Sequence, residues 1–163
     1  MLDVRWLLVS CSLVLAACGS DPADVAGNYS IALTNGANGC DFENWDEGAT
    51  AQNIDLTVTQ DGENASATVG GLAGAYLEVV LGSRVYQGTV DGDHLHLQIF
   101  GTPSATEGNC TWTVNSTVRA ELDGDVLTGT IDYTKATNGN PDCAAFEGCV
   151  TRQNFNGTRP PTL

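Results

Sequence analysis

The chain has 163 residues, and 20 Asp or Glu against 6 Lys or Arg give it a formal net charge of −14. Such an acidic surface repels nucleic acid and anionic lipid headgroups, which argues against a polyanionic partner. The length is that of one domain with a sizeable core. The 19 glycines, together with many Thr, Asn and Asp residues, favour strands and turns over helices.

The first eighteen residues have the pattern of an export signal. An apolar run from Trp6 to Leu15 is far shorter than the roughly 20 residues of a transmembrane helix, and it ends in small residues, as a secretory signal does. The segment Leu15-Ala16-Ala17-Cys18 resembles the lipobox of bacterial lipoproteins. The resemblance implies that residues 1–17 are removed and that Cys18 becomes an acylated N-terminus, which anchors the protein to a membrane through lipid.

The residue after Cys18 indicates to which membrane a lipoprotein of this kind is sorted. Among bacterial lipoproteins an aspartate after the lipidated cysteine favours the inner membrane, and this chain has Gly19 instead. The resemblance therefore implies the outer membrane of a Gram-negative cell, on its periplasmic or its outer side. The alternative is an ordinary signal peptide with a chance cysteine.

The strand-forming region follows a short tether. Residues 18–26 are small, acidic and proline-bearing, residues 27–159 carry the domain, and residues 160–163 are a C-terminal tail. In the domain apolar and polar residues alternate, which is the mark of half-buried strands. The clearest face holds Trp112, Val114, Val118, Ala120 and Leu122. The pattern predicts about eight strands, near residues 27–34, 51–60, 64–70, 84–91, 93–100, 110–122, 125–135 and 148–158.

Short and long connections alternate between these strands. The pairs Asp61-Gly62, Asp91-Gly92 and Asp123-Gly124 suit the tight turns of hairpins. If successive strands are antiparallel, these turns share one end, and the long connections near 35–50, 71–83, 101–109 and 136–147 share the other. A meander of this kind can close on itself. The sequence therefore predicts an all-β fold, an antiparallel up-and-down β-barrel of about eight strands; the segment 70–74 is expected as a flexible rim loop, and 72–81 is ambiguous between loop and helix.

In this arrangement the chain resembles the calycins, the group that holds lipocalins, fatty-acid-binding proteins and avidins. Those families begin the first strand with Gly-x-Trp at the closed end, where a basic residue of the last strand packs over the ring. The matching positions are Gly27-Asn28-Tyr29 and Arg159, with Tyr in place of Trp. The resemblance is architectural, so it implies a calycin-like barrel and assigns no function.

Four cysteines lie in the domain, and an even number in an exported protein predicts two disulfides. The last strand should neighbour the first, and the loop before the last strand should neighbour the sixth. We therefore expect the bridges Cys40–Cys149 and Cys110–Cys143. The alternative pairs Cys143 with Cys149 and Cys40 with Cys110.

Candidate binding residues gather on one long connection, the segment CDFENWDEG at residues 40–48. Aromatic side chains and carboxylates on a loop can stack a sugar, hold a cation or dock a protein. The candidates are Asp41, Phe42, Glu43, Trp45 and Asp46. Trp45 could instead plug the barrel, in which case its truncation would be a costly core deletion.

No catalytic, metal or cofactor site is predicted. His94 and His96 alternate with Leu95 and Leu97, which turns both imidazoles to solvent, and two ligands without a third make a poor metal site. The expected function is non-enzymatic binding of a small apolar or sugar-like ligand, or of a protein partner, at the long-loop end.

Two alternatives stay open. One is a structural or protein-interaction module whose barrel is filled by Trp112, Tyr29, Tyr133 and Phe155. The other is a hydrolase. An open-mouthed cavity above ~300 Å³ would favour ligand binding.

Overall fold

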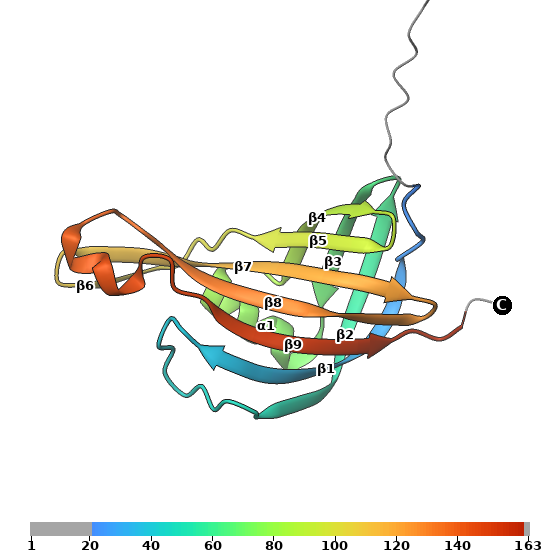
Figure 1. Cartoon of the computed structure of the whole chain (residues 1–163), viewed down its shortest axis with the longest axis horizontal. Helices are drawn as coiled ribbons and strands as arrows, with labels where there is room; N and C mark the ends of the chain where they lie inside the picture. Colours follow the sequence, from blue (N-terminus) through green and yellow to red (C-terminus); the bar gives the residue numbers. More distant parts are fainter. Residues whose placement is uncertain (1–20, 162–163) are drawn as a thin grey trace, which may run out of the picture.

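The computed structural model describes residues 21–161, which form a closed antiparallel β-barrel (Figure 1). Successive barrel strands pair with one another, β9 pairs with β1, and β5 pairs with β7 to close the ring. This confirms the all-β, up-and-down barrel of eight strands. The barrel strands are β1 (Gly27–Asn38), β2 (Thr50–Asp61), β3 (Asn64–Val69), β4 (Val85–Asp91), β5 (His94–Ile99), β7 (Cys110–Asp123), β8 (Val126–Thr137) and β9 (Thr151–Thr158).

Three two-residue turns lie at one end of the barrel, which we call the closed end. They join β2 to β3, β4 to β5 and β7 to β8. In each turn the first residue is a glycine of positive φ, 59° at Gly62, 58° at Gly92 and 59° at Gly124. The second turn residue does not have a positive φ, so the turns follow the type II′ pattern, which places glycine first. The aspartate of each Asp-Gly pair therefore ends its strand, and the glycine alone turns the chain.

The predicted alternation of inward and outward residues holds along the strands. On β5, Leu95, Leu97 and Ile99 are 1%, 1% and 4% exposed, whereas His94 and His96 are exposed on the outside. Val118 and Ala120 of β7 are buried in the same core. These positions match the faces expected from the sequence.

The residues before β1 and after β9 seal the closed end. Val25 is fully buried, and its N–H donates to Gln60 Oε1 at 2.8 Å. The Tyr29 hydroxyl donates to the Val25 carbonyl oxygen at 2.9 Å. The Arg159 guanidinium lies 5.7 Å from the centre of the Tyr29 ring and donates to Asp125 Oδ1 at 3.0 Å. The basic residue over the Gly-x-aromatic ring, which the resemblance to calycins implies, is thus present.

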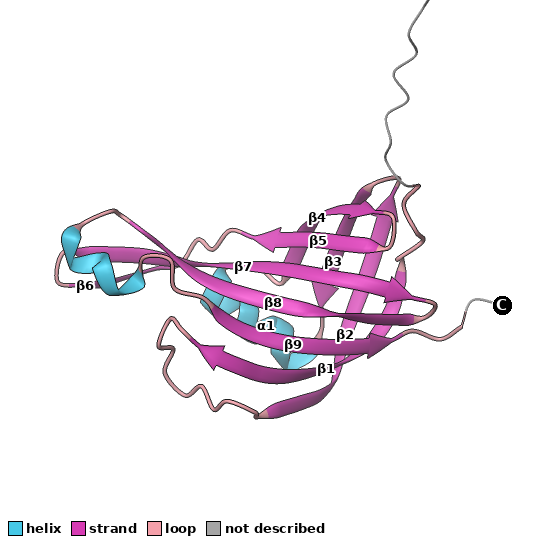
Figure 2. Ribbon diagram, viewed as in Figure 1, coloured by secondary structure: helices cyan, strands magenta, loops and turns pink. Residues whose placement is uncertain are grey.

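One of the expected loops is a helix, α1 (Gly71–Leu81), between β3 and β4 (Figure 2). The segment 70–74 is therefore the start of a helix and not a flexible rim loop. The helix begins after Gly70, which supplies no side-chain cap, and ends at Gly82 with a left-handed φ of 78°. Apolar residues lie on both of its faces, so the amphipathic period that marks a helix in a sequence is missing here.

The expected loops at 101–109 and 136–147 also contain regular structure. Strand β6 (Ser104–Glu107) forms a hairpin with the first residues of β7, turning at Gly108, whose φ is 58°. The 3-10 helix η1 (Pro141–Phe146) lies beside it. Together β6, the start of β7 and η1 form an arm that extends from the barrel (Figure 1). The arm exists because β7 is longer than the strands with which it closes the barrel: β5 pairs with residues 116–121 of β7, and β6 with residues 110–113.

The predicted signal segment 1–17 and the predicted lipidation site, Cys18, lie outside the described residues. Within residues 21–161 no helix has both the length and the apolarity that a membrane crossing requires.

Candidate ligand cavity

A cavity of about 750 Å³ lies inside the barrel, at the end opposite the closed end. Aliphatic and aromatic side chains from all eight barrel strands and α1 form most of its wall. Its lining residues Glu43, Asn44 and Tyr76 are exposed, which places the opening between α1 and the β1–β2 connection. The apolar lining consists of Ile31, Leu33, Phe42, Trp45, Ile54, Leu56, Ala67, Val69, Ala73, Tyr76, Leu77, Val80, Tyr86, Leu95, Leu97, Val114, Val118, Leu127, Ile131, Tyr133 and Phe155.

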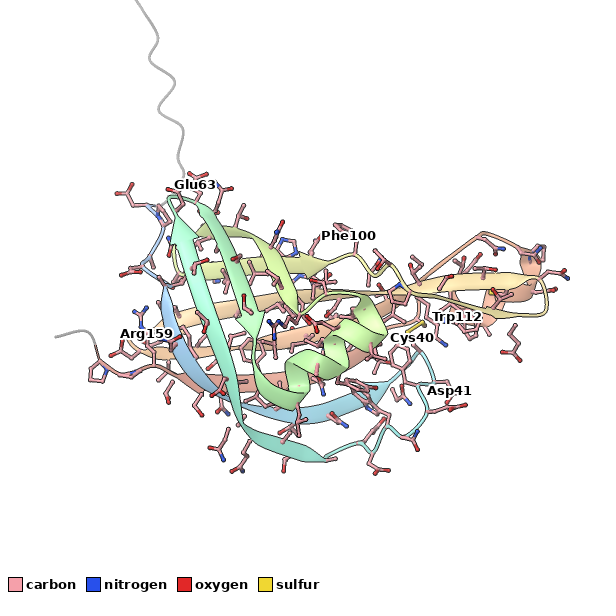
Figure 3. The ribbon with its side chains drawn as sticks, turned by 180° about the vertical axis from the view of Figure 1, so that it is seen from behind. Cys40, Asp41, Glu63, Phe100, Trp112 and Arg159 are labelled. Atoms are coloured by element: carbon pink, nitrogen blue, oxygen red, sulfur yellow. A yellow bond between two sulfur atoms is a disulfide. The ribbon has the colours of Figure 1, made fainter. Side chains whose placement is uncertain are left out.

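Helix α1 covers part of this opening and contacts β2, β3 and β7 (Figure 3). Ala73, Leu77 and Val80 face the cavity and are partly buried. On the other side of the helix, Leu72 is 90% and Val79 75% exposed. A cover with few buried apolar contacts is an element of low local stability, and such elements are the ones that open.

The β1–β2 connection forms the opposite rim of the cavity. Phe42, Trp45 and Tyr133 contact one another, with ring centres 6.2 to 6.4 Å apart and two of the three pairs edge-to-face. The indole Nε1 of Trp45 donates to the carbonyl oxygen of Gly36 at 2.9 Å. Trp45 is half-buried and lines the cavity at its mouth.

The five candidate binding residues of the sequence divide into two groups. Phe42, Glu43 and Trp45 line the cavity. Asp41 and Asp46 are exposed and do not line it, and Asp41 points away from the barrel (Figure 3). The structure thus brings the two aromatic candidates and one carboxylate to the mouth.

The rim is fixed by a disulfide, Cys40–Cys149. The Cys40 N–H donates to Thr151 Oγ1 at 3.0 Å, and the Thr151 hydroxyl donates to Asn38 Oδ1 at 3.0 Å. Thr151 is fully buried. These bonds tie the start of the rim to β9, beside which β1 lies.

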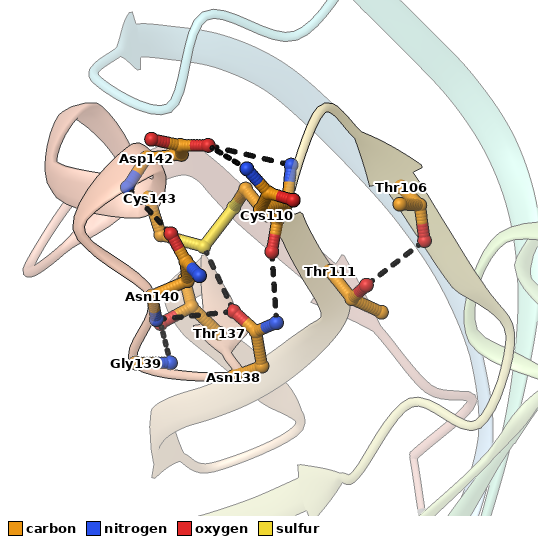
Figure 4. The surroundings of a disulfide bond; sticks show 10 residues. Thr106, Cys110, Thr111, Thr137, Asn138, Gly139, Asn140, Asp142 and Cys143 are labelled. Carbon is orange, nitrogen blue, oxygen red and sulfur yellow. Dashed lines mark hydrogen bonds between the residues drawn. A yellow bond between two sulfur atoms is a disulfide. The ribbon is translucent and has the colours of Figure 1, made fainter.

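The second disulfide, Cys110–Cys143, ties η1 to β7 in the arm (Figure 4). The two bridges have the pairing favoured from the sequence. Asp142 Oδ2 accepts a bond of 2.9 Å from Asn109 Nδ2, and Asn138 Nδ2 donates to the Asn109 carbonyl oxygen at 3.0 Å. The arm is therefore a stapled unit outside the barrel.

The arm also holds Trp112, which the alternative of a filled barrel requires in the interior. Its ring packs on Phe146 with centres 4.7 Å apart, and the Lys135 ammonium lies 3.6 Å from the centre of the Phe146 ring. Burial among these rings lowers the pKa of Lys135. Tyr29 and Phe155 are buried in the barrel as expected, but with Trp112 outside it the interior keeps its cavity.

A row of hydrogen-bonded polar side chains lies at the cavity wall: Tyr86, Tyr133 and Gln153 line the cavity, and Ser116 is buried beside them without lining it. The Tyr86 and Ser116 hydroxyls are 2.9 Å apart, and Ser116 is paired with Tyr133 across β7 and β8. The Tyr133 hydroxyl donates to Gln153 Oε1 at 2.9 Å, and Gln153 Nε2 donates to Asn35 Oδ1 at 2.8 Å. We call Tyr86, Ser116, Tyr133 and Gln153 the polar row.

Both phenols of the polar row stay protonated near neutral pH. Burial raises the pKa of Tyr86 and raises that of Tyr133 well above its usual range. Neutral phenols donate and accept hydrogen bonds and are not bases. Tyr86 was not a candidate from the sequence, although its place on an alternating strand signals that it faces inward.

The described residues offer little acid–base or metal chemistry. Residues 21–161 contain no group of three His, Cys, Asp or Glu side chains that could hold a metal ion. Glu43 is the one carboxylate among the described lining residues, and His94 and His96 lie on the outer face. The wall is therefore built for contact with apolar groups and for a few neutral hydrogen bonds.

No protein-family model and no curated protein matches this chain. The solved structure of EF1p2_mFAP2b bound to DFHBI is similar to this chain, with a TM-score of 0.36 and 12% sequence identity, over 83% of this chain and 93% of that one.

Proposed function

We propose that this protein binds a small, largely apolar ligand inside its barrel. The observation that carries the proposal is the cavity of about 750 Å³ with its apolar wall and open mouth. Ligand sites in proteins have volumes of roughly 300–1,000 Å³ and combine an apolar lining with a few polar groups. The aliphatic lining favours an apolar ligand over a sugar. The volume of the cavity argues against the alternative of a structural module with a filled barrel.

We further infer a binding protein and not an enzyme. Catalysis of hydrolysis needs an activated nucleophile or a pair of acid–base groups within hydrogen-bond reach of the substrate. The described cavity wall has one carboxylate, Glu43, at its mouth. The hydroxyl of Ser116 lies beside Tyr86, whose phenol is not a base near neutral pH, so no described neighbour activates it.

Titration with Nile red, a neutral apolar dye that fluoresces when it leaves water, tests the ligand proposal. Two substitutions on the same helix serve as a matched pair. Ala73→Trp places an indole in the cavity, whereas Ala75→Trp places one on the exposed side of α1. We expect saturable binding by the wild type and by Ala75→Trp, and binding at least about tenfold weaker in Ala73→Trp, a loss of about 1.4 kcal/mol. Absence of saturable binding, or equal losses in both variants, would contradict the proposal.

The resemblance of Leu15-Ala16-Ala17-Cys18 to a lipobox supports a second proposal, that the mature protein is an outer-membrane lipoprotein anchored through Cys18. More than one acyl chain gives stable anchoring where a single chain is marginal. Mass spectrometry of the protein from membranes of a Gram-negative host should find a mature chain that starts at an acylated Cys18. Cys18→Ser should abolish that processing, and a mature chain that starts at any other residue would refute the anchor.

A further inference from the structure

The polar row has apolar lining on both of its sides: Val114, two residues from Ser116 toward the opening, also lines the wall. The polar row lies toward the opening: β4 leaves α1 just before Tyr86, and Ser116 pairs with Ile99 at the end of β5. Toward the closed end the wall is aliphatic, with Leu95, Leu97 and Leu127 each 1% exposed. A ligand with one polar group can therefore place that group at the row and its apolar part below it.

The polar row retains hydrogen-bonding capacity on the cavity side. Tyr133 uses its proton on Gln153, which leaves oxygen lone pairs to accept a bond. Tyr86 shares one bond with Ser116, in which either hydroxyl can be the donor. The Tyr86 and Tyr133 side chains also interact with each other. When Ser116 donates, the Tyr86 proton can bond to Tyr133 or to a ligand oxygen; when Tyr86 donates, its lone pairs can accept a bond. The row can thus serve a hydroxyl or a carbonyl group.

The described cavity wall has no positively charged side chain beside the polar row. The described lining residues include no Lys, Arg or His. Lys135 lies 3.6 Å from the ring centre of Phe146 in the arm and 5.4 Å from that of the rim residue Phe42, but it is not itself a lining residue. Arg84 pairs with Glu78 at 3.4 Å. Transfer of an ionised carboxylate into such a wall without a counter-charge is costly. Glu43 at the mouth and the net charge of −14 add repulsion.

We propose that the cavity selects a neutral amphiphile, an aliphatic molecule whose hydroxyl group bonds to Tyr86 and Tyr133 or whose carbonyl group accepts from Tyr86, and that it discriminates against the carboxylate of the same length. The inference rests on the proposed binding of an apolar ligand in this cavity. Hydrogen bonding to the row orients the ligand and favours a hydroxyl, because the Tyr133 oxygen can accept a bond from a hydroxyl and cannot accept one from a carboxylate. The lack of a lining cation adds to the discrimination against the carboxylate.

Displacement of Nile red by three molecules of equal chain length tests the discrimination. Decan-1-ol, decanoate and decylammonium share a ten-carbon chain and carry a neutral, an anionic and a cationic polar group at neutral pH. We expect decan-1-ol to compete at a concentration at least about tenfold below that of either ion, since each ion would be buried without a partner. Equal competition by decanoate, or stronger competition by decylammonium, would overturn the inference while leaving the proposed function intact. Failure of Nile red itself to bind is the separate outcome that would remove the proposed function.

Variants that delete one hydroxyl locate the selective group. Tyr86→Phe and Tyr133→Phe keep the ring and remove the bond, and we expect each to reduce the preference for decan-1-ol over decanoate by about three- to tenfold. Tyr29→Phe is the matched control, because Tyr29 is buried at the closed end, bonds to Val25 and does not line the cavity. An unchanged preference in both cavity variants, or the same reduction in Tyr29→Phe, would overturn the assignment of the polar row.

Discussion

The two disulfides should stabilise the barrel by different amounts, because they close loops of different length. Cys40–Cys149 spans 109 residues and Cys110–Cys143 spans 33. If a disulfide acts by restricting the unfolded chain, these loops correspond to about 4.8 and about 3.7 kcal/mol. Replacing both cysteines of a bridge by alanine should therefore cost up to these amounts, with the variant lacking Cys40–Cys149 about 1 kcal/mol less stable.

The bridges also differ in what they hold. Cys40 begins the cavity rim, whereas Cys110–Cys143 lies in the arm. Removal of the rim bridge should weaken Nile red binding as well as lower stability, and removal of the arm bridge should lower stability alone.

Urea denaturation followed by circular dichroism measures the loss of stability in both variants. The dependence of the unfolding free energy on urea concentration, the slope of the transition, reports how much surface the unfolded chain exposes. The slope should rise in both variants, because the unfolded chain without a bridge exposes more surface. An equal or larger loss of stability in the arm variant would refute the argument from loop length. Equal loss of Nile red binding in both would refute the separate roles of rim and arm.

Three further predictions concern single side chains. Trp45→Ala should weaken Nile red binding and lower the free energy of unfolding by about 1–3 kcal/mol in urea denaturation. The loss should be smaller than the ~3–5 kcal/mol of a fully buried ring, because the Trp45 ring is half-buried. An unchanged dye affinity would contradict the place of Trp45 in the cavity wall. The carboxylate of Asp132 has a lowered pKa, chiefly because Arg152 donates a hydrogen bond to it at 2.6 Å. The ionised carboxylate therefore stabilises the fold at neutral pH, and this stabilisation is lost as the pH falls through the lowered pKa. Asp132→Asn should therefore be about 1–2 kcal/mol less stable than the wild type at neutral pH and should approach it in acid, and melting curves that differ equally at all pH values would contradict this. Gly124→Ala should cost about 1 kcal/mol through its φ of 59° alone, since no atom lies within 4 Å of an added Cβ; melting temperature is the measurement, and a stability equal to that of the wild type would refute the strain.

The features that follow from local periodicity could be predicted from the sequence. Alternation such as that of Leu95 and Leu97 sets the inward face of a strand, and a glycine after a strand-ending aspartate sets a hairpin. The order of strands then brings Cys40 to Cys149 without further information, because β9 must lie beside β1 to close the barrel. Strand faces and hairpins are short-range signals, and closure of the barrel then determines which distant strands become neighbours.

Helix α1, the arm and the polar row could not be predicted, because a periodic pattern of apolar residues says nothing about helix caps, relative strand lengths or strand register. Helix α1 has apolar residues on both faces and a glycine in place of a side-chain cap, so neither the helical period nor a start signal is visible. The overhang of β7 that makes the arm depends on its length relative to β5. The polar row depends on register, since the contact between Tyr86 and Ser116 joins residues 30 positions apart.

Pairing of the first strand with the last also has a consequence for how the chain comes to fold. Thr151 bonds to Asn38 across 113 residues, and strand β1 has β9 as a neighbour along most of its length. Contacts this distant in sequence make folding slow, because a long loop must be ordered before they form. A chain that emerges N-terminus first, from a ribosome or through a membrane, cannot close its barrel until β9 has emerged. Over that interval the apolar inner face is open, and Cys40 and Cys110 are both present before either of their partners. Any bridge that forms between them has to be exchanged after the last strand arrives.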